Sequence, residues 1–92
     1  MNPFEENNII NTNIQIEIWL EINGRKKNTF ISGWNIPINE LKDHIKNIKK
    51  KNGCNGTIKS NNLIQLQGDH IDYIIDYINN TGISDEFIKI KG

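Results

Sequence analysis

The amino-acid sequence predicts an α+β fold in which two helices pack on one face of a five-stranded mixed sheet. Three observations predict it. One long segment alternates apolar and polar residues with the period of a β-strand, and shorter alternating segments lie farther along the chain. Two other segments place isoleucine and leucine at helical spacing. The resulting order is ββαββαβ, and an open-faced, ferredoxin-like sandwich buries every apolar face.

The domain organisation is simple. Residues 1–13 are polar, asparagine-rich and aperiodic, which predicts a disordered tail. The remainder, 14–92, has the length of a single domain that can build a core without disulfides. The tail also lacks the basic and apolar regions of a signal peptide, and no apolar run is long enough to span a membrane. We therefore expect a cytoplasmic protein with no membrane segment.

The first strand is predicted from Ile14 to Ile22. Every even-numbered residue in this range is isoleucine or leucine, and the odd-numbered ones are polar residues and Trp19, so one face should be buried. Asn23 and Gly24 then supply the positive φ angles of a tight hairpin. We expect a loop at 23–27 that carries three adjacent cations, and a return strand at about 28–32.

The first helix is predicted between Pro37 and Gly53, with Asn39 as its N-cap and the glycine as its C-cap. Its apolar residues form a stripe at spacings of three and four: Ile38, Leu41, Ile45 and Ile48. Its lysines are predicted to share the opposite face: Lys42, Lys46, Lys49 and Lys50. Such a face is either a solvated helix surface or a binding surface.

Two short strands at 57–59 and 63–67 follow, joined by a tight turn at 60–62. After Gly68, Asp69 should cap a second helix, with Asp72 in the place of a capping-box residue. That helix ends at 80–82, and a last strand runs over 87–91. The uncovered face of the sheet is predicted to carry Trp19, Gln65, Gln67, Phe87 and Lys89.

The net charge is zero, but the charges are separated along the chain. Nine of the eleven basic residues and only two acidic ones, Glu40 and Asp43, lie between Arg25 and Lys59, which gives this segment 9 − 2 = +7. A basic side favours a polyanionic partner. A solvated lysine surface explains the composition equally well, and the charge pattern alone does not separate the two.

Catalytic patterns are weak. The single cysteine, Cys54, excludes an internal disulfide and has the position of a small buried residue. His44 and His70 have no spacing that suits zinc, and the sequence neighbours Asp69 and His70 are poor grounds for a catalytic pair. No glycine-rich loop opens a helix in the manner of a phosphate-binding loop. We therefore expect a non-enzymatic protein without a cofactor.

Three strings together resemble eukaryotic translation initiation factor 1: Asn-Gly-Arg-Lys at 23–26, Lys-Lys-Lys-Asn-Gly-Cys-Asn-Gly-Thr at 49–57, and Ile-Gln-Leu-Gln-Gly-Asp at 64–69. The ending at 88–92 is similar to the closing strand of that family, and Asn-Pro-Phe-Glu at 2–5 is similar to its tail element. The resemblance covers about 14–92 and implies the fold expected above.

The resemblance also implies a function. Members of the family bind the small ribosomal subunit near the P site, contact ribosomal RNA, keep the subunit open for scanning and oppose full seating of initiator tRNA until the start codon pairs. Implied partners are therefore the small subunit, neighbouring initiator tRNA and mRNA, and other initiation factors. The protein is expected to act as a monomer without a cofactor.

The implied site follows from matching positions. Arg25 and Lys26 match the basic hairpin loop of the family, and Lys49 and Lys50 match its basic helix positions. With their neighbours, the candidate RNA-binding residues are Asn23, Gly24, Arg25, Lys26, Lys27, Lys42, Lys46, Lys49, Lys50, Lys51 and Lys59. Ser60, Asn61 and Asn62 form the candidate tRNA-facing loop, and Gly68 and Asp69 form the signature turn.

The sequence departs from the family in three places. The loop at 60–62 is about four residues shorter than in typical eukaryotic members, the alternation of the first strand is one residue out of phase, and the terminal phenylalanine is missing. The short loop leaves open a reinitiation or recycling module. A third interpretation is a decoy that engages host initiation factors through its acidic helix and tail without productive ribosome binding. The composition, rich in Ile, Asn and Lys, suggests a giant virus or an AT-rich protist as the source, and a viral protein would act in the host cytoplasm.

Overall fold

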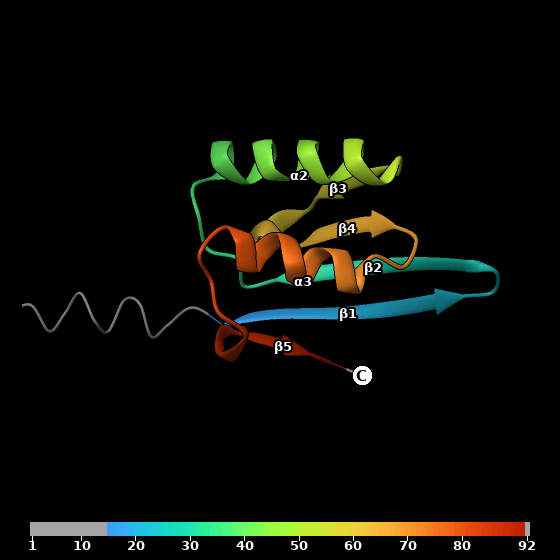
Figure 1. Ribbon diagram of the computed structural model, residues 1–92. Helices are drawn as coiled ribbons and strands as arrows, with labels where there is room; N and C mark the ends of the chain where they lie inside the picture. Colours follow the sequence, from blue (N-terminus) through green and yellow to red (C-terminus); the bar gives the residue numbers. More distant parts are fainter. Residues whose placement is uncertain (1–14, 92) are drawn as a thin grey trace, which may run out of the picture.

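The computed structural model describes residues 15–91. The predicted tail at 1–13 and the predicted strand start at Ile14 lie outside this range. The elements in chain order are β1 (Ile16–Asn23), β2 (Lys26–Ser32), α2 (Ile38–Asn52), β3 (Gly56–Ile58), the 3-10 turn η1 (Ser60–Asn62), β4 (Ile64–Gln67), α3 (Ile71–Asn80), the 3-10 turn η2 (Asp85–Phe87) and β5 (Ile88–Ile90) (Figure 1).

The five strands form one mixed sheet in the order β3-β4-β2-β1-β5. β5 pairs in parallel with β1, with Ile16 opposite Ile88, and the other neighbours are antiparallel. Both helices lie on the same side of this sheet (Figure 1). The predicted α+β fold and its ββαββαβ order are confirmed. Neither helix among the described residues is both long and apolar enough to cross a membrane.

The core lies between the helices and the sheet. Each helix presents aliphatic residues at helical spacing, and each long strand presents alternate residues, so the buried side chains meet in one cluster. Its fully buried aliphatic members are Ile16, Ile18, Ile31, Leu41, Ile48, Ile64, Leu66, Ile74 and Ile78. Ile38, expected in the stripe of the first helix, is 46% exposed, because it is the first helical residue and extends past the edge of the core.

The ends of α2 were predicted with mixed success. Gly53 takes a left-handed φ of 58° and is the C-cap of the helix, as predicted. The N-cap prediction for Asn39 is wrong, since the helix begins at Ile38 and Pro37 occupies the capping position without a side-chain hydrogen bond. Proline presets the φ angle at this position, so the helix can start without a polar cap.

The segment between β2 and α2 contributes Trp34 to the core, where it is 2% exposed. Its indole stacks on the His44 imidazole with ring centroids 5.2 Å apart, and Tyr77 meets the indole edge-on. His44 Nδ1 and the Tyr77 hydroxyl form a 2.8 Å hydrogen bond. Since His44 lies on α2 and Tyr77 on α3, this aromatic cluster joins the two helices.

Within residues 15–91, no helix covers the other face of the sheet. Trp19 lies on it as predicted and stacks on Phe30 of the neighbouring strand, with centroids 5.5 Å apart and a 9° angle between the rings. The Trp19 Nε1 donates to Glu21 at 3.0 Å, and the Lys91 ammonium lies 4.5 Å from the ring centroid. Trp19 therefore covers Phe30 and is held by its neighbours. Phe87 departs from the prediction, because it ends η2 and precedes the last strand.

Candidate nucleic-acid interface

The β1–β2 hairpin extends beyond the rest of the sheet. Its last pairs join Ile22 to Lys27 and Asn23 to Lys26, whereas β4 reaches β2 only as far as Asn28. The tip is a two-residue turn, Gly24-Arg25, in which the glycine takes a φ of 67° (Figure 1). The predicted five-residue loop at 23–27 is therefore too long, because Asn23 and the two lysines belong to the strands.

The projecting part of the hairpin is cationic and exposed. Arg25, Lys26 and Lys27 are all exposed. Ile22, predicted to lie on the buried face, is 64% exposed, because the hairpin at this point has no helix against it. A strand pair that leaves the core in this way carries its charges into solvent, where they can meet a partner without moving the core.

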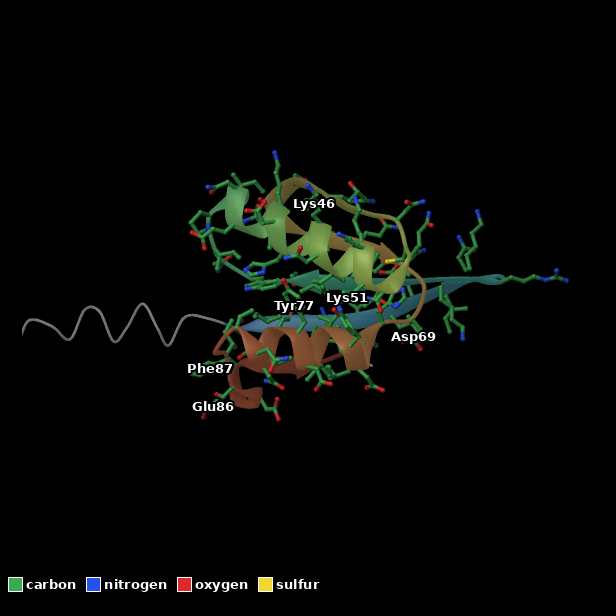
Figure 2. All side chains as sticks on the ribbon, turned by 45° about the horizontal axis from the view of Figure 1, so that its top comes forward. Lys46, Lys51, Asp69, Tyr77, Glu86 and Phe87 are labelled. Carbon is green, nitrogen blue, oxygen red and sulfur yellow. The ribbon has the colours of Figure 1, made fainter. Side chains whose placement is uncertain are left out.

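The lysines of α2 divide between two flanks of the helix. Lys42, Lys46 and Lys49 line a groove between α2 and the edge strand β3, with Ile45 and Ile58 as its apolar part. Lys50 and Lys51 line a second groove on the side of α3, together with Tyr73 and Tyr77. Figure 2 shows Lys46 and Lys51 on these different sides. Lys50 thus borders a different groove from Lys42, Lys46 and Lys49, although helical spacing keeps all four within one arc of the helix.

Lys49 is the lysine most involved in the fold. It is half-buried, and its ammonium lies 3.5 Å from the Gly56 carbonyl oxygen. Burial raises the pKa of the nearby Cys54 thiol, and the positive charge of Lys49 partly opposes this by lowering the pKa. Cys54 packs against the core and stays a protonated thiol at neutral pH, but it is only partly buried, so it lies at the margin of the core rather than inside it as predicted.

The hairpin cations and the end of α2 lie at the same end of the molecule. α2 runs toward the hairpin tip and ends at Gly53, and the chain returns along β3 in the opposite direction (Figure 1). Arg25, Lys26 and Lys27 therefore share an end with Lys49, Lys50 and Lys51. We call these six residues the basic end.

Lys59 and the loop at Ser60–Asn62 lie elsewhere. β3 is antiparallel to β4, and Ile58 and Ile64 are paired with each other next to Ile31, well away from the hairpin tip. The loop is as tight as predicted: it forms η1, and Asn61 and Asn62 take φ angles of 61° and 57°. The structure therefore does not bring Lys59 together with the basic end.

Acidic residues mark a different part of the surface. α3 contains Asp72 and Asp76, both exposed, and no lysine or arginine. Asp69 precedes the helix, and Asp85 and Glu86 lie in η2 below it (Figure 2). The separation of charge along the sequence thus becomes a separation in space, with α2 basic over most of its length and α3 acidic.

The signature turn at Gly68-Asp69 fastens the hairpin to α3. The Gly68 N–H donates to the Lys27 carbonyl at 2.7 Å. The Thr29 hydroxyl donates to the Gly68 carbonyl at 2.6 Å and accepts from the His70 N–H at 3.0 Å. The base of the projecting hairpin and the start of α3 are thereby held by one buried hydroxyl.

This arrangement corrects the predicted helix cap. His70, rather than Asp69, occupies the N-cap position of α3, and it makes no side-chain cap bond. The Asp69 carboxylate accepts only a long hydrogen bond of 3.4 Å from the Ile71 N–H. Asp72 makes no capping-box contact with the start of the described helix. A threonine from a neighbouring strand supplies the acceptor, which no local motif could show.

A corner is formed where β4 turns away at Gly68 and β2 continues toward the tip. It encloses about 520 Å³ and is lined by Arg25, Lys26, Lys27, Asn28, Gln67 and Gly68. Asn28 and Gln67 are directly opposed across the strand pair. Neither had been predicted as a binding residue, since a single amide in a strand carries no motif; their pairing needs the register of the sheet.

Comparison with known proteins agrees with the resemblance found in the sequence. A family model described as translation initiation factor SUI1 matches residues 11–84. A protein translation factor SUI1 homologue from Nitrosopumilus maritimus is 39% identical over 66 residues, which are 72% of this chain and 64% of the relative. Homologues of the same description from Thermococcus gammatolerans and Thermococcus kodakarensis are each 32% identical over 95 aligned positions, covering 99% of this chain and 96% of each relative.

Proposed function

The chain belongs to the SUI1 family of translation initiation factors, and we propose that it binds the small ribosomal subunit near the P site and controls scanning and start-codon selection. The relatives are described as translation factors, which supports a role in initiation. The position on the subunit and the effect on start-codon choice are the parts that the proposal adds.

One observation carries the proposal: the basic end joins a projecting cationic hairpin to the lysine-rich end of α2. Arg25, Lys26 and Lys27 extend beyond the core, so they can enter a groove of folded RNA. Lys50 and Lys51 remain on the body of the protein and can contact neighbouring phosphates. Structured RNA is read largely by its shape and its phosphates, which suits two separated groups of cations on a rigid support.

The acidic side of the molecule orients this contact. Asp72 and Asp76 on α3 are repelled by RNA, so the protein approaches with α3 directed away from the phosphate surface. That leaves α3 and η2 facing solvent or a neighbouring initiation factor. The charge arrangement thus favours one orientation on the subunit.

The mechanism that follows is occupancy. The factor binds one conformation of the subunit more tightly than another and therefore shifts the population toward it, and it must dissociate before the next step. No bond is made or broken, so we assign neither a catalytic residue nor a cofactor. The compact loop at Ser60–Asn62 is placed toward initiator tRNA in this proposal, and its small size limits how far it can oppose tRNA seating.

A direct test measures binding of the labelled full chain to purified small ribosomal subunits across a salt series. Wild-type protein is compared with Arg25→Glu, Lys26→Glu and Lys50→Glu, and with Lys89→Glu as the matched charge reversal on the edge strand β5. Lys49 is left out, because its ammonium lies near the Gly56 carbonyl. We expect salt-sensitive binding that the three reversals weaken about tenfold or more and the control spares. Salt-insensitive binding, or equal loss in the control, would contradict the proposal.

The short loop favours a second candidate, a reinitiation or recycling module on the same subunit. An unlabelled initiation factor 1 from the same translation system separates the two. Displacement by that factor supports the initiation role, and binding that it does not displace supports the second candidate. A decoy acting through α3 would instead keep its effect on translation when Arg25, Lys26 and Lys50 are all reversed.

A further inference from the structure

We propose that the corner between β2 and the Gly68 turn binds one unpaired nucleotide of RNA and reads its base through the amides of Asn28 and Gln67. This inference rests on the proposed function, since it assumes that the basic end meets RNA. It adds a base-specific element to a contact that phosphates alone would make independent of sequence.

The lining of the corner is the first argument. Three of its six residues are cations, two are primary amides and one is glycine, and none of the six is acidic or aliphatic. An apolar peptide anchor would find no apolar side chain among them. A nucleotide fits this lining better. Its phosphate can contact the cations, and the edge of its base can form hydrogen bonds with the amides.

The position of the two amides is the second argument. Asn28 and Gln67 are directly paired across antiparallel strands, which places their Cβ atoms about 4.5–5.5 Å apart. Their side chains therefore emerge side by side on the same face of the sheet. Each amide offers one acceptor and two donors at fixed spacing, whereas the flexible lysines beside them offer donors only. Two adjacent amides are suited to reading a base edge, and lysines to holding a phosphate.

The backbone supplies the third argument. Gly68 takes a φ of 98°, and the Thr29 hydroxyl and the Lys27 carbonyl hold both of its polar backbone groups. Gln67 is fixed similarly, since its N–H donates to the Asn55 carbonyl at 2.9 Å. The backbone of this wall is thus held in place, so binding has to order only the side chains that it carries. The missing side chain of Gly68 makes room for the His70 imidazole, whose Nε2 lies 2.7 Å from the Gln67 carbonyl oxygen, so His70 supports the turn from behind.

The size of the corner and its amide side chains indicate which ligand and which base it can accept. A cavity of about 520 Å³ lies within the range of small-ligand pockets, roughly 300–1,000 Å³. A terminal amide pairs in bidentate fashion with N6 and N7 of adenine, which makes adenine the base that fits best. By register, the carboxylate nearest to Asn28 on the strand face is that of Glu21, which already accepts the Trp19 N–H. It repels phosphate from the β1 side and so directs the nucleotide toward the cationic side of the corner.

The test uses four RNA hairpins that are identical except for one bulged nucleotide, A, C, G or U, and a fully paired hairpin as reference. Binding of the full wild-type chain is measured by fluorescence anisotropy at low salt. We expect the adenine bulge to bind at least about fivefold more tightly than the C, G and U bulges and than the paired reference, because one good bidentate contact discriminates against the wrong base by that much or more. Gln67→Leu should remove this preference while leaving binding to the paired hairpin unchanged.

Two further variants keep the experiment decisive. Gln65→Leu is the matched control, since Gln65 lies on the same face of β4 two residues earlier and does not line the corner. Lys26→Ala should weaken all five RNAs by the same factor. Circular dichroism of each variant checks folding.

Equal binding of all five RNAs by wild type would overturn base reading while leaving the proposed function in place. Loss of the preference in Gln65→Leu as well, or competition by polyglutamate as strong as that by RNA, would also overturn it. A preference for another base that disappears in Gln67→Leu would support the corner as a nucleotide site and correct the base.

Discussion

The hydroxyl of Thr29 lies 2.6 Å from the carbonyl oxygen of Gly68, to which it donates, although 39 residues separate them. Thr29 is the one polar residue that is fully buried among the described residues. It joins the strand that carries the hairpin cations to the turn that starts α3, and so it determines how the hairpin leaves the core.

Thr29→Val should destabilise the fold by about 1–3 kcal/mol. Valine has nearly the same shape, but the His70 N–H loses its acceptor and the Gly68 carbonyl loses its donor. Urea unfolding followed by circular dichroism measures the change. Thr29→Ser is the control, because it keeps the hydroxyl and removes one methyl group, which costs about 1 kcal/mol. A valine variant as stable as wild type would show that these hydrogen bonds contribute nothing.

Gly33→Ala should be strongly destabilising. Gly33 takes a φ of 83°, and an added Cβ would lie 2.1 Å from the Gln15 carbonyl oxygen, so the start of β1 would have to move. Gly82 has a φ of 106° and open space around it. Gly82→Ala therefore isolates the backbone strain, of order 1–2 kcal/mol, and Gly33→Ala should exceed it clearly in thermal unfolding. Equal losses would mean that Gln15 moves away at little cost.

Tyr77→Phe should lower stability by about 0.5–1.5 kcal/mol through loss of the hydrogen bond to His44 Nδ1. Tyr73→Phe is the matched control, since Tyr73 lies one turn earlier on α3 and its hydroxyl takes part in no hydrogen bond between described residues. The difference between the two variants in urea unfolding measures the contact between the helices. Equal effects would indicate that the hydroxyl of Tyr77 adds nothing to ring packing.

The sequence predicted those features that depend on local periodicity and on glycine. Leu41, Ile45 and Ile48 are buried because spacing along a helix defines its face, and Gly53 ends that helix as expected. The exposure of Ile22 could not be predicted, because alternation within β1 does not reveal where β4 stops. The role of Thr29 depends on a partner far away in sequence.

The residues of the candidate site also fall into those that the sequence could predict and those that it could not. The hairpin and helix lysines could be predicted as binding residues because they belong to contiguous sequence motifs. That Lys50 and Lys46 lie on different flanks depends on which neighbour each side of α2 meets, β3 or α3. The pairing of Asn28 with Gln67 likewise depends on register.

The Cys54 thiol should react with iodoacetamide more slowly in the folded protein than in the unfolded chain near neutral pH. Burial raises the pKa of this thiol, so less thiolate is present at a given pH, and the thiolate is the reactive form. The native state then holds its proton to higher pH than the unfolded state does. The associated stability is complete below the unfolded pKa and falls as pH rises through the folded pKa. Lys49→Gln removes a charge that lowers the pKa, and should slow alkylation further; faster alkylation would contradict this assignment.

The salt dependence of subunit binding should show which residues of the basic end contact phosphate. A lysine that neutralises one phosphate contributes about one unit to the slope of log K against log salt. Lys26 lies on the projecting hairpin, whereas Lys89 is an equally exposed lysine on β5 at the other edge of the sheet. Lys26→Ala should therefore reduce the slope by about one and weaken binding, while Lys89→Ala leaves both unchanged, with small subunits titrated at several salt concentrations as the assay. Equal slopes in the two variants would mean that the hairpin tip does not touch phosphate, and a reduced slope in Lys89→Ala alone would place RNA at the β5 edge of the sheet instead.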